Sequence, residues 1–185
     1  MIINRALLGL ALITAAGFSM DTGADSAAAC AALTARDADA LVGTSLPENF
    51  VRDTPPTPQN GQDHTRVCGW FPAGYDLATA SAPPARGILM TLHVMQSTAD
   101  AKAFHAQTSA ATRALADADP AGSTVTDLIG VGEDAILEQS TTDGAAIVTI
   151  KFVKDDTAAQ VQVWHDATTA GNVAAAAAKQ IADRL

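Results

Sequence analysis

The chain has 185 residues, of which 20 are acidic and 11 basic, and its formal net charge is −9. Nucleic acids and anionic lipid headgroups are bound by clusters of Lys and Arg, and this sequence contains no such cluster. The charge balance therefore excludes nucleic acid as a partner, and the length suits one domain with one core.

The N-terminal segment has the features of a signal peptide. Arg5 precedes an uncharged apolar run over residues 6–18, which is shorter than the ~20 residues that span a bilayer. Small side chains over residues 26–29 suit a signal peptidase. We expect a signal peptide in residues 1–29, cleaved between Gly17 and Ala29, and one exported domain over residues 30–185, periplasmic or extracellular. The sequence contains no second apolar run of membrane length.

The chain has two cysteines, Cys30 and Cys68, and an exported domain is in an oxidising compartment. The simplest prediction is a disulfide between them. The alternative is a lipid anchor on Cys30, because the alanines at 27–29 resemble the small-residue half of a lipidation box. That box lacks its usual large aliphatic residue, and lipidation would leave Cys68 without a disulfide partner.

The first half of the domain is predicted to contain one helix and two strands. Thr34 and Asp37 favour a helix that begins at Thr34 and ends at Gly43. Residues 44–65 contain four prolines and are predicted to form a long irregular loop. Residues 66–71 and 87–96 then have strand character, the second with clear alternation.

In the second half, Ser97 and Asp100 open a predicted helix that runs to about Ala118. Its expected buried stripe is Phe104, Thr108, Ala111 and Leu115. Four apolar segments separated by turn residues predict an antiparallel meander over residues 123–129, 134–139, 145–153 and 157–165. The chain closes with a helix over residues 169–185, whose buried face is predicted to carry Val173, Ala177, Ile181 and Leu185.

The predicted order is α-β-β-α-β-β-β-β-α. Because helices and strands are segregated rather than alternating, the fold class is α+β: an antiparallel sheet of about six strands with helices packed on one face.

Three aromatic side chains, Trp70, Phe71 and Tyr75, cluster after the second cysteine. One interpretation is a ligand or partner surface, because aromatic rings supply broad contact area. The other is that Trp70 and Phe71 alternate on a strand, so that one enters the core and one rests against the loop.

Catalytic and metal-binding patterns are scarce. Glycines 130 and 132 lack the third glycine and the following helix of a dinucleotide loop, so residues 130–134 are predicted to form a turn. No Gly-x-Ser-x-Gly occurs. The histidines have no close metal-ligand spacing, and the only plausible metal ligands are Asp63, His64, His93 and His165. We therefore expect no enzyme activity, no metal and no cofactor.

Several short motifs occur in a suggestive order. Cys30 stands three residues before Leu33, a short Asp- and Ala-rich helix follows, and Cys68 stands two residues before Trp70. Residues 130–135 read Gly-Val-Gly-Glu-Asp-Ala, and an Ala-rich helix ends the chain. This order resembles small exported or lipid-anchored bacterial domains of unknown function, although the chain departs from the lipid-anchored ones at the lipidation box. The resemblance implies a noncatalytic envelope protein with helices on a sheet.

These observations predict an exported binding or accessory domain that recognises an envelope protein or a small ligand without chemistry. The rival is a hydrolase or metal-dependent enzyme, which requires His93, His165 and an acid to converge in the fold. A sensory ectodomain and a lipid-anchored envelope protein are further alternatives. The sequence leaves the oligomeric state open.

Overall fold

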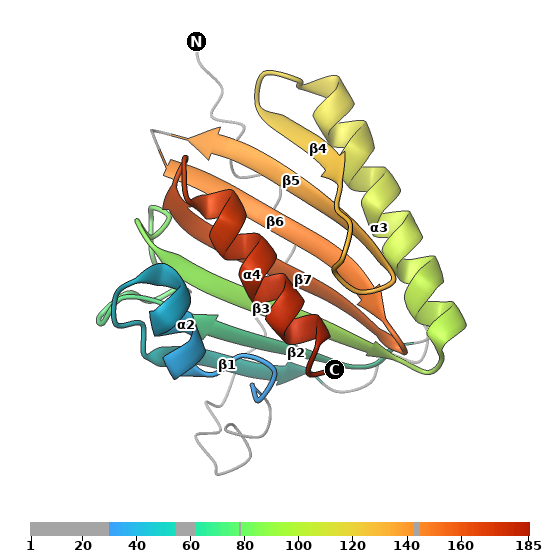
Figure 1. The fold of residues 1–185 in the computed structure, drawn as a ribbon, viewed down its shortest axis with the longest axis horizontal. Helices are drawn as coiled ribbons and strands as arrows, with labels where there is room; N and C mark the ends of the chain where they lie inside the picture. Colours follow the sequence, from blue (N-terminus) through green and yellow to red (C-terminus); the bar gives the residue numbers. More distant parts are fainter. Residues whose placement is uncertain (1–29, 55–61, 78, 143–144) are drawn as a thin grey trace.

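The computed structural model describes residues 30–54, 62–77, 79–142 and 145–185. The predicted signal peptide and the turn residues Asp143 and Gly144 lie outside these ranges. The described residues form helices and an antiparallel sheet, which confirms the α+β class (Figure 1). No helix within these ranges has the length and the apolar character that a membrane crossing requires.

The sheet has seven strands among the described residues, all antiparallel, in the order β1-β2-β3-β7-β6-β5-β4. Their bounds are Glu48–Thr54 (β1), Gln62–Trp70 (β2), Gly87–Met95 (β3), Ser123–Asp127 (β4), Asp134–Thr142 (β5), Ala145–Lys154 (β6) and Thr157–Asp166 (β7). The predicted meander is confirmed in β4 to β7. Its last strand, β7, pairs with β3, so the two halves of the chain meet in the middle of the sheet.

The prediction of an irregular loop over residues 44–65 is wrong. This segment contains β1 and the start of β2, which raises the strand number from six to seven. Pro47 lies just before β1, and three other prolines fall in residues 55–61, outside the described ranges, so no described strand contains a proline. An edge strand pairs through its backbone on one side only, and it needs no strong apolar alternation.

Helix α2 (Ala35–Val42) begins and ends where the sequence predicts. The Asp37 carboxylate accepts a hydrogen bond from the Thr34 N–H at 2.9 Å, and the Thr34 hydroxyl accepts one from the Asp37 N–H at 3.2 Å. Gly43 ends the helix with φ 73°, a left-handed conformation that glycine adopts without strain. The same Asp37 carboxylate pairs with Arg184 at 2.6 Å, which fastens the C-terminus to this helix.

The disulfide between Cys30 and Cys68 is present, with the two Cα atoms 5.9 Å apart. Both side chains are buried in the core, so the bond fastens the segment before α2 to β2. Because the Cys30 sulfur is bonded to Cys68, it is not free to carry lipid in this form of the protein.

One face of the sheet supplies the main core. Its apolar residues on β3, β6 and β7 pack against α4 (Ala170–Ala182) and α2, both of which lie in front of the sheet in Figure 1. The predicted stripe of α4 is confirmed at Val173, Ala177 and Ile181, all buried, whereas Leu185 lies beyond the helix and is 40% exposed. Alanines bring α4 close to the strands.

Helix α3 (Thr98–Ala118) lies against the opposite face, so the helices do not all pack on one side as expected. Its Thr112 contacts Lys151, whose neighbours Ile150 and Phe152 point to the α4 side. The stripe predicted for this helix is wrong by about one position, and Leu115 is 68% exposed. The buried side chains of α3 are Ala101, His105, Ser109, Thr112 and Ala116.

Candidate functional site

The sheet face that α3 partly covers carries polar side chains beside a small apolar cluster that includes Met95 and Val153. Neighbours across an antiparallel sheet point to the same side, and the register places Thr91, Gln160 and Lys151 in one row across β3, β7 and β6. The next row runs from Leu89 through Gln162 and Thr149 to Glu138. We call five residues of these two rows, Thr91, Thr149, Lys151, Gln160 and Gln162, the polar face. All five are half-buried except Thr149, which is buried.

Strict alternation produces this face. On β7, Val161 and Val163 point to the main core. Gln160, just before them, and Gln162, between them, therefore point away from it. On β6 the same alternation places Thr149 and Lys151 on the side opposite Val148, Ile150 and Phe152. The strands that build the main core therefore present hydrogen-bonding groups on their other side.

Lys151 is held at the boundary between the polar face and α3. Its Nζ donates a hydrogen bond to the Thr112 hydroxyl at 2.5 Å, and that hydroxyl donates in turn to the Thr108 carbonyl at 2.9 Å. Burial lowers the pKa of Lys151, and the charge of Glu138 opposes this shift. Beside it, the Gln162 amide donates to the Thr149 hydroxyl at 3.4 Å.

A second polar cluster lies near the middle of α3. His105 is buried, and its Nε2 lies 3.3 Å from the Ser109 hydroxyl and 3.6 Å from the Asp134 carboxylate. Burial lowers the pKa of His105, with smaller and opposing influences from the charges of Asp134 and Lys151. A pocket of about 450 Å³ opens beside these groups, lined by Lys102, His105, Ala106, Glu133, Asp134 and Val153.

The grouping of Ser109, His105 and Asp134 does not have the geometry of a catalytic triad. In a triad the serine and the acid contact different nitrogens of the imidazole, whereas here both approach Nε2. Ser109 also lies on the same helix as His105, one turn further along, and its side chain is buried. The cluster connects α3 to the sheet.

The aromatic residues singled out in the sequence lie at the end of the sheet near Gly87. Trp70 and Phe71 are fully buried, and only Tyr75 reaches the surface, half-buried. Phe71 packs against Tyr75 at 5.2 Å and Trp164 at 5.7 Å between ring centroids. The Tyr75 hydroxyl donates to the Ala82 carbonyl at 3.1 Å. These rings therefore belong mainly to the interior.

The histidines considered as metal ligands do not converge. His93 pairs with Ala158 on β7, and His165 lies seven residues further along the same strand, about 23 Å away and on the other face. His93 stacks on Phe104 at 4.8 Å, and burial lowers its pKa to about 4. His64 is paired with Val94. The side chain of Asp63 lies outside the described residues, and no group of three metal-ligating side chains occurs among those described.

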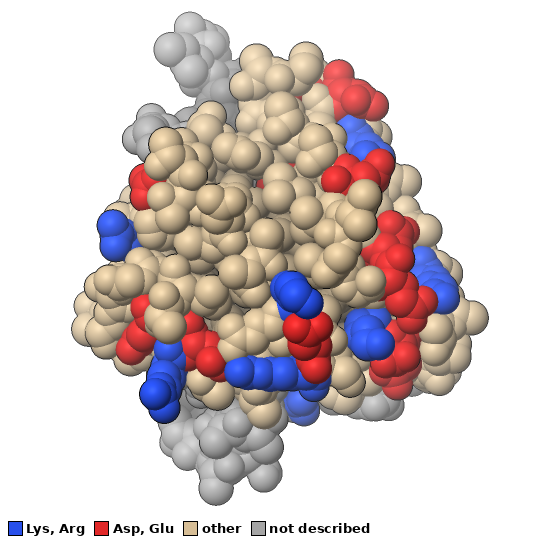
Figure 2. All heavy atoms as spheres, in the orientation of Figure 1, with Lys and Arg blue, Asp and Glu red and all other residues tan. Residues whose placement is uncertain are grey.

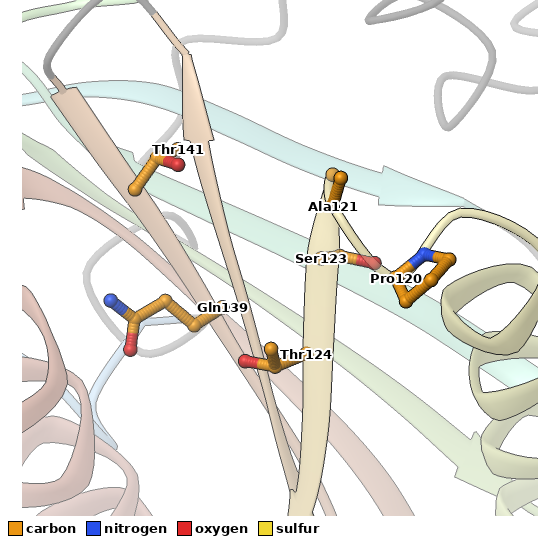
Figure 3. Close-up of a pocket in the computed structure, with 7 residues that line it drawn as sticks. Pro120, Ala121, Ser123, Thr124, Gln139 and Thr141 are labelled. Carbon is orange, nitrogen blue, oxygen red and sulfur yellow. The ribbon is translucent and has the colours of Figure 1, made fainter.

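The face covered by α4 offers a small pocket of about 150 Å³ near the β4 edge. Figure 3 shows Thr124, Gln139 and Thr141 around it, with Pro120 at its rim. In Figure 2 the charged side chains gather near α2, the C-terminus and along α3, while the middle of the face shown is mostly uncharged. The lining carries hydroxyl and amide groups and no ionisable side chain, whereas the polar face combines such groups with the ammonium of Lys151.

Comparison with known proteins shows the fold and no family. No family model and no curated protein matches this sequence. The structure is similar to the extracellular domain of PknH from Mycobacterium tuberculosis, with a TM-score of 0.56 and 14% sequence identity over 83% of this chain and 92% of that one. At this identity the likeness concerns the arrangement of helices and strands.

Proposed function

We propose that this chain is an exported, noncatalytic binding domain whose polar face contacts a ligand or partner. The observation that carries the proposal is the polar face itself: five hydrogen-bonding side chains, most of them partly exposed, on the central strands of the sheet. Amides and hydroxyls both donate and accept, so this surface suits recognition of a polar molecule.

The combination of groups on the polar face supports a binding role. Its amides and hydroxyls lie beside the ammonium of Lys151, and Glu138 is the next neighbour of Thr149 in its row. The groups inside this surface are held in place, since Gln162 bonds Thr149 and Lys151 bonds Thr112. Polar groups held in position before binding lose less conformational entropy when a ligand arrives.

Export is supported by three observations: the apolar leader, the disulfide and the fold shared with an extracellular domain. Intact mass of the protein recovered from the envelope or medium tests it. We expect a chain cleaved between Gly17 and Ala29, with thiols that react with an alkylating agent only after reduction. A diacylglycerol mass on Cys30 would instead establish the lipid-anchored alternative.

Binding is tested by NMR titration of the labelled domain with polar compounds from the envelope fraction. We expect chemical-shift changes to cluster on β3, β6 and β7, and the double variant Thr91→Ala/Gln162→Ala to lose them. A matched control, Thr124→Ala/Gln139→Ala, removes the same two residue types from the opposite side of the sheet and should bind normally. Shifts that map to the control site, or equal binding by both variants, would refute the proposal.

A further inference from the structure

We propose that Lys151 forms an anion-binding position in the polar face, which takes the carboxylate or phosphoryl group of a small ligand. This inference rests on the proposed function and names the chemical class of the ligand. It starts from a comparison of the four lysines of the chain.

Three of the lysines have a carboxylate partner on the protein. Lys102 pairs with Glu133 at 2.7 Å, Lys179 with Asp183 at 3.2 Å and Lys154 with Asp155 at 3.5 Å. These pairs are substantially exposed, where a salt bridge contributes little to stability.

Lys151 is half-buried, and none of the described carboxylates lies within ion-pair distance of its Nζ. A buried cation without a counter-ion loses hydration that its protein contacts do not replace. Its bond to Thr112 is a neutral hydroxyl contact, and Glu138 acts on it only at longer range. Lys151 is therefore the most buried of these lysines and the one to which the described residues supply no carboxylate within ion-pair distance.

Hydrogen-bond direction leaves part of this ammonium available. The Thr112 hydroxyl donates its proton to the Thr108 carbonyl, so it can only accept a hydrogen bond from Lys151. This contact uses one of the three N–H groups of the Lys151 ammonium. Two remain. Gln160 is the direct cross-strand neighbour of Lys151, and Thr91 is the neighbour of Gln160 on the other side.

Side chains that face each other across adjacent strands have Cβ atoms about 5 Å apart, so the Gln160 amide lies beside Lys151, and the Thr91 hydroxyl lies one strand further, about 10 Å from it. A small anion on Lys151 would therefore contact Gln160, with Thr91 at the far end of the row. Charge-assisted hydrogen bonds from Lys to carboxylate or phosphate are about twice as strong as neutral ones. The net charge of −9 repels polyanions at long range, which restricts the ligand to a small one.

The test uses the full exported domain with sodium acetate and inorganic phosphate as separate probes, against sodium chloride at equal ionic strength. We expect one probe or both to shift the amide signals of Gln160 and Thr91 in a saturable way. The variant Lys151→Met keeps the aliphatic stem and removes the charge, and it should weaken binding about tenfold or more. Lys179→Met, the matched control, should bind as the unaltered chain does.

A response to acetate identifies the carboxylate class, and a response to phosphate identifies the phosphoryl class. Absence of a saturable response to both probes, or an equal response by Lys151→Met, overturns the inference. If envelope compounds still bind the polar face and Lys151→Met binds them unchanged, the proposed function stands and the anion position is refuted.

Discussion

The disulfide gives the most direct test of what holds this fold together. Cys30 and Cys68 are 38 residues apart in sequence, and the bond closes a loop that contains α2 and β1. In the chain-entropy model a loop of this size restricts the unfolded chain by about 4 kcal/mol at 25 °C. That value is a large share of the roughly 5–15 kcal/mol by which a domain of this size is stable.

We therefore expect reduction to lower the free energy of unfolding by about 4 kcal/mol. With a urea slope of about 2 kcal/mol/M, the midpoint falls by about 2 M. The measurement is urea unfolding followed by circular dichroism, with and without a phosphine reductant, and the variant Cys30→Ala/Cys68→Ala serves as the second arm. Equal midpoints for the oxidised and reduced protein would refute the reasoning.

Three further predictions concern single side chains. Gly132 has φ 57°, and a Cβ there would collide with the Val153 carbonyl. Gly132→Ala should therefore lower the free energy of unfolding in urea by at least about 1 kcal/mol. The control Gly171→Ala, in open space on α4, should be neutral or stabilising. Ile181→Ala should cost about 2–5 kcal/mol because the side chain is fully buried, and an equal loss for the exposed Leu115→Ala would contradict the observed packing. Burial lowers the pKa of His93 to about 4, so as the pH falls the unfolded chain takes up a proton on this residue before the folded chain does. The contribution of His93 to stability should be constant above about pH 6.5 and should fall by roughly 3 kcal/mol towards pH 4. An unchanged pH profile in His93→Phe would refute this.

Features that depend on neighbouring residues could be predicted from the sequence. The capping pair Thr34 and Asp37 and the glycine at 43 define α2, and short turns define the hairpins of β5 to β7. Alternation also separates the two sides of β6. These signals are local, because each involves residues within a few positions of one another.

What could not be predicted depends on partners that are distant in sequence. The stripe of α3 follows the polar surface of the sheet beneath it, so a search for large apolar residues selects Leu115 instead of His105 and Thr112. The row of the polar face exists because β7 pairs with β3, which brings Thr91 beside Gln160 across a separation of 69 residues. The missing counter-ion of Lys151 is visible only when all its neighbours are known.

The two helical layers differ in the kind of side chain that becomes exposed to water when each separates from the sheet. Opening α4 exposes Val, Ile and Ala side chains and therefore amounts to unfolding the domain. Opening α3 hydrates His105, Ser109, Thr112 and Lys151, which water solvates readily, together with a smaller apolar cluster of Met95, Ala101, Phe104 and Val153. Backbone amides of α3 should consequently exchange with solvent through a partial opening of lower free energy than the global transition. We therefore expect the face under α4 to stay covered as long as the core is folded, and the face under α3 to be uncovered at a lower cost in free energy.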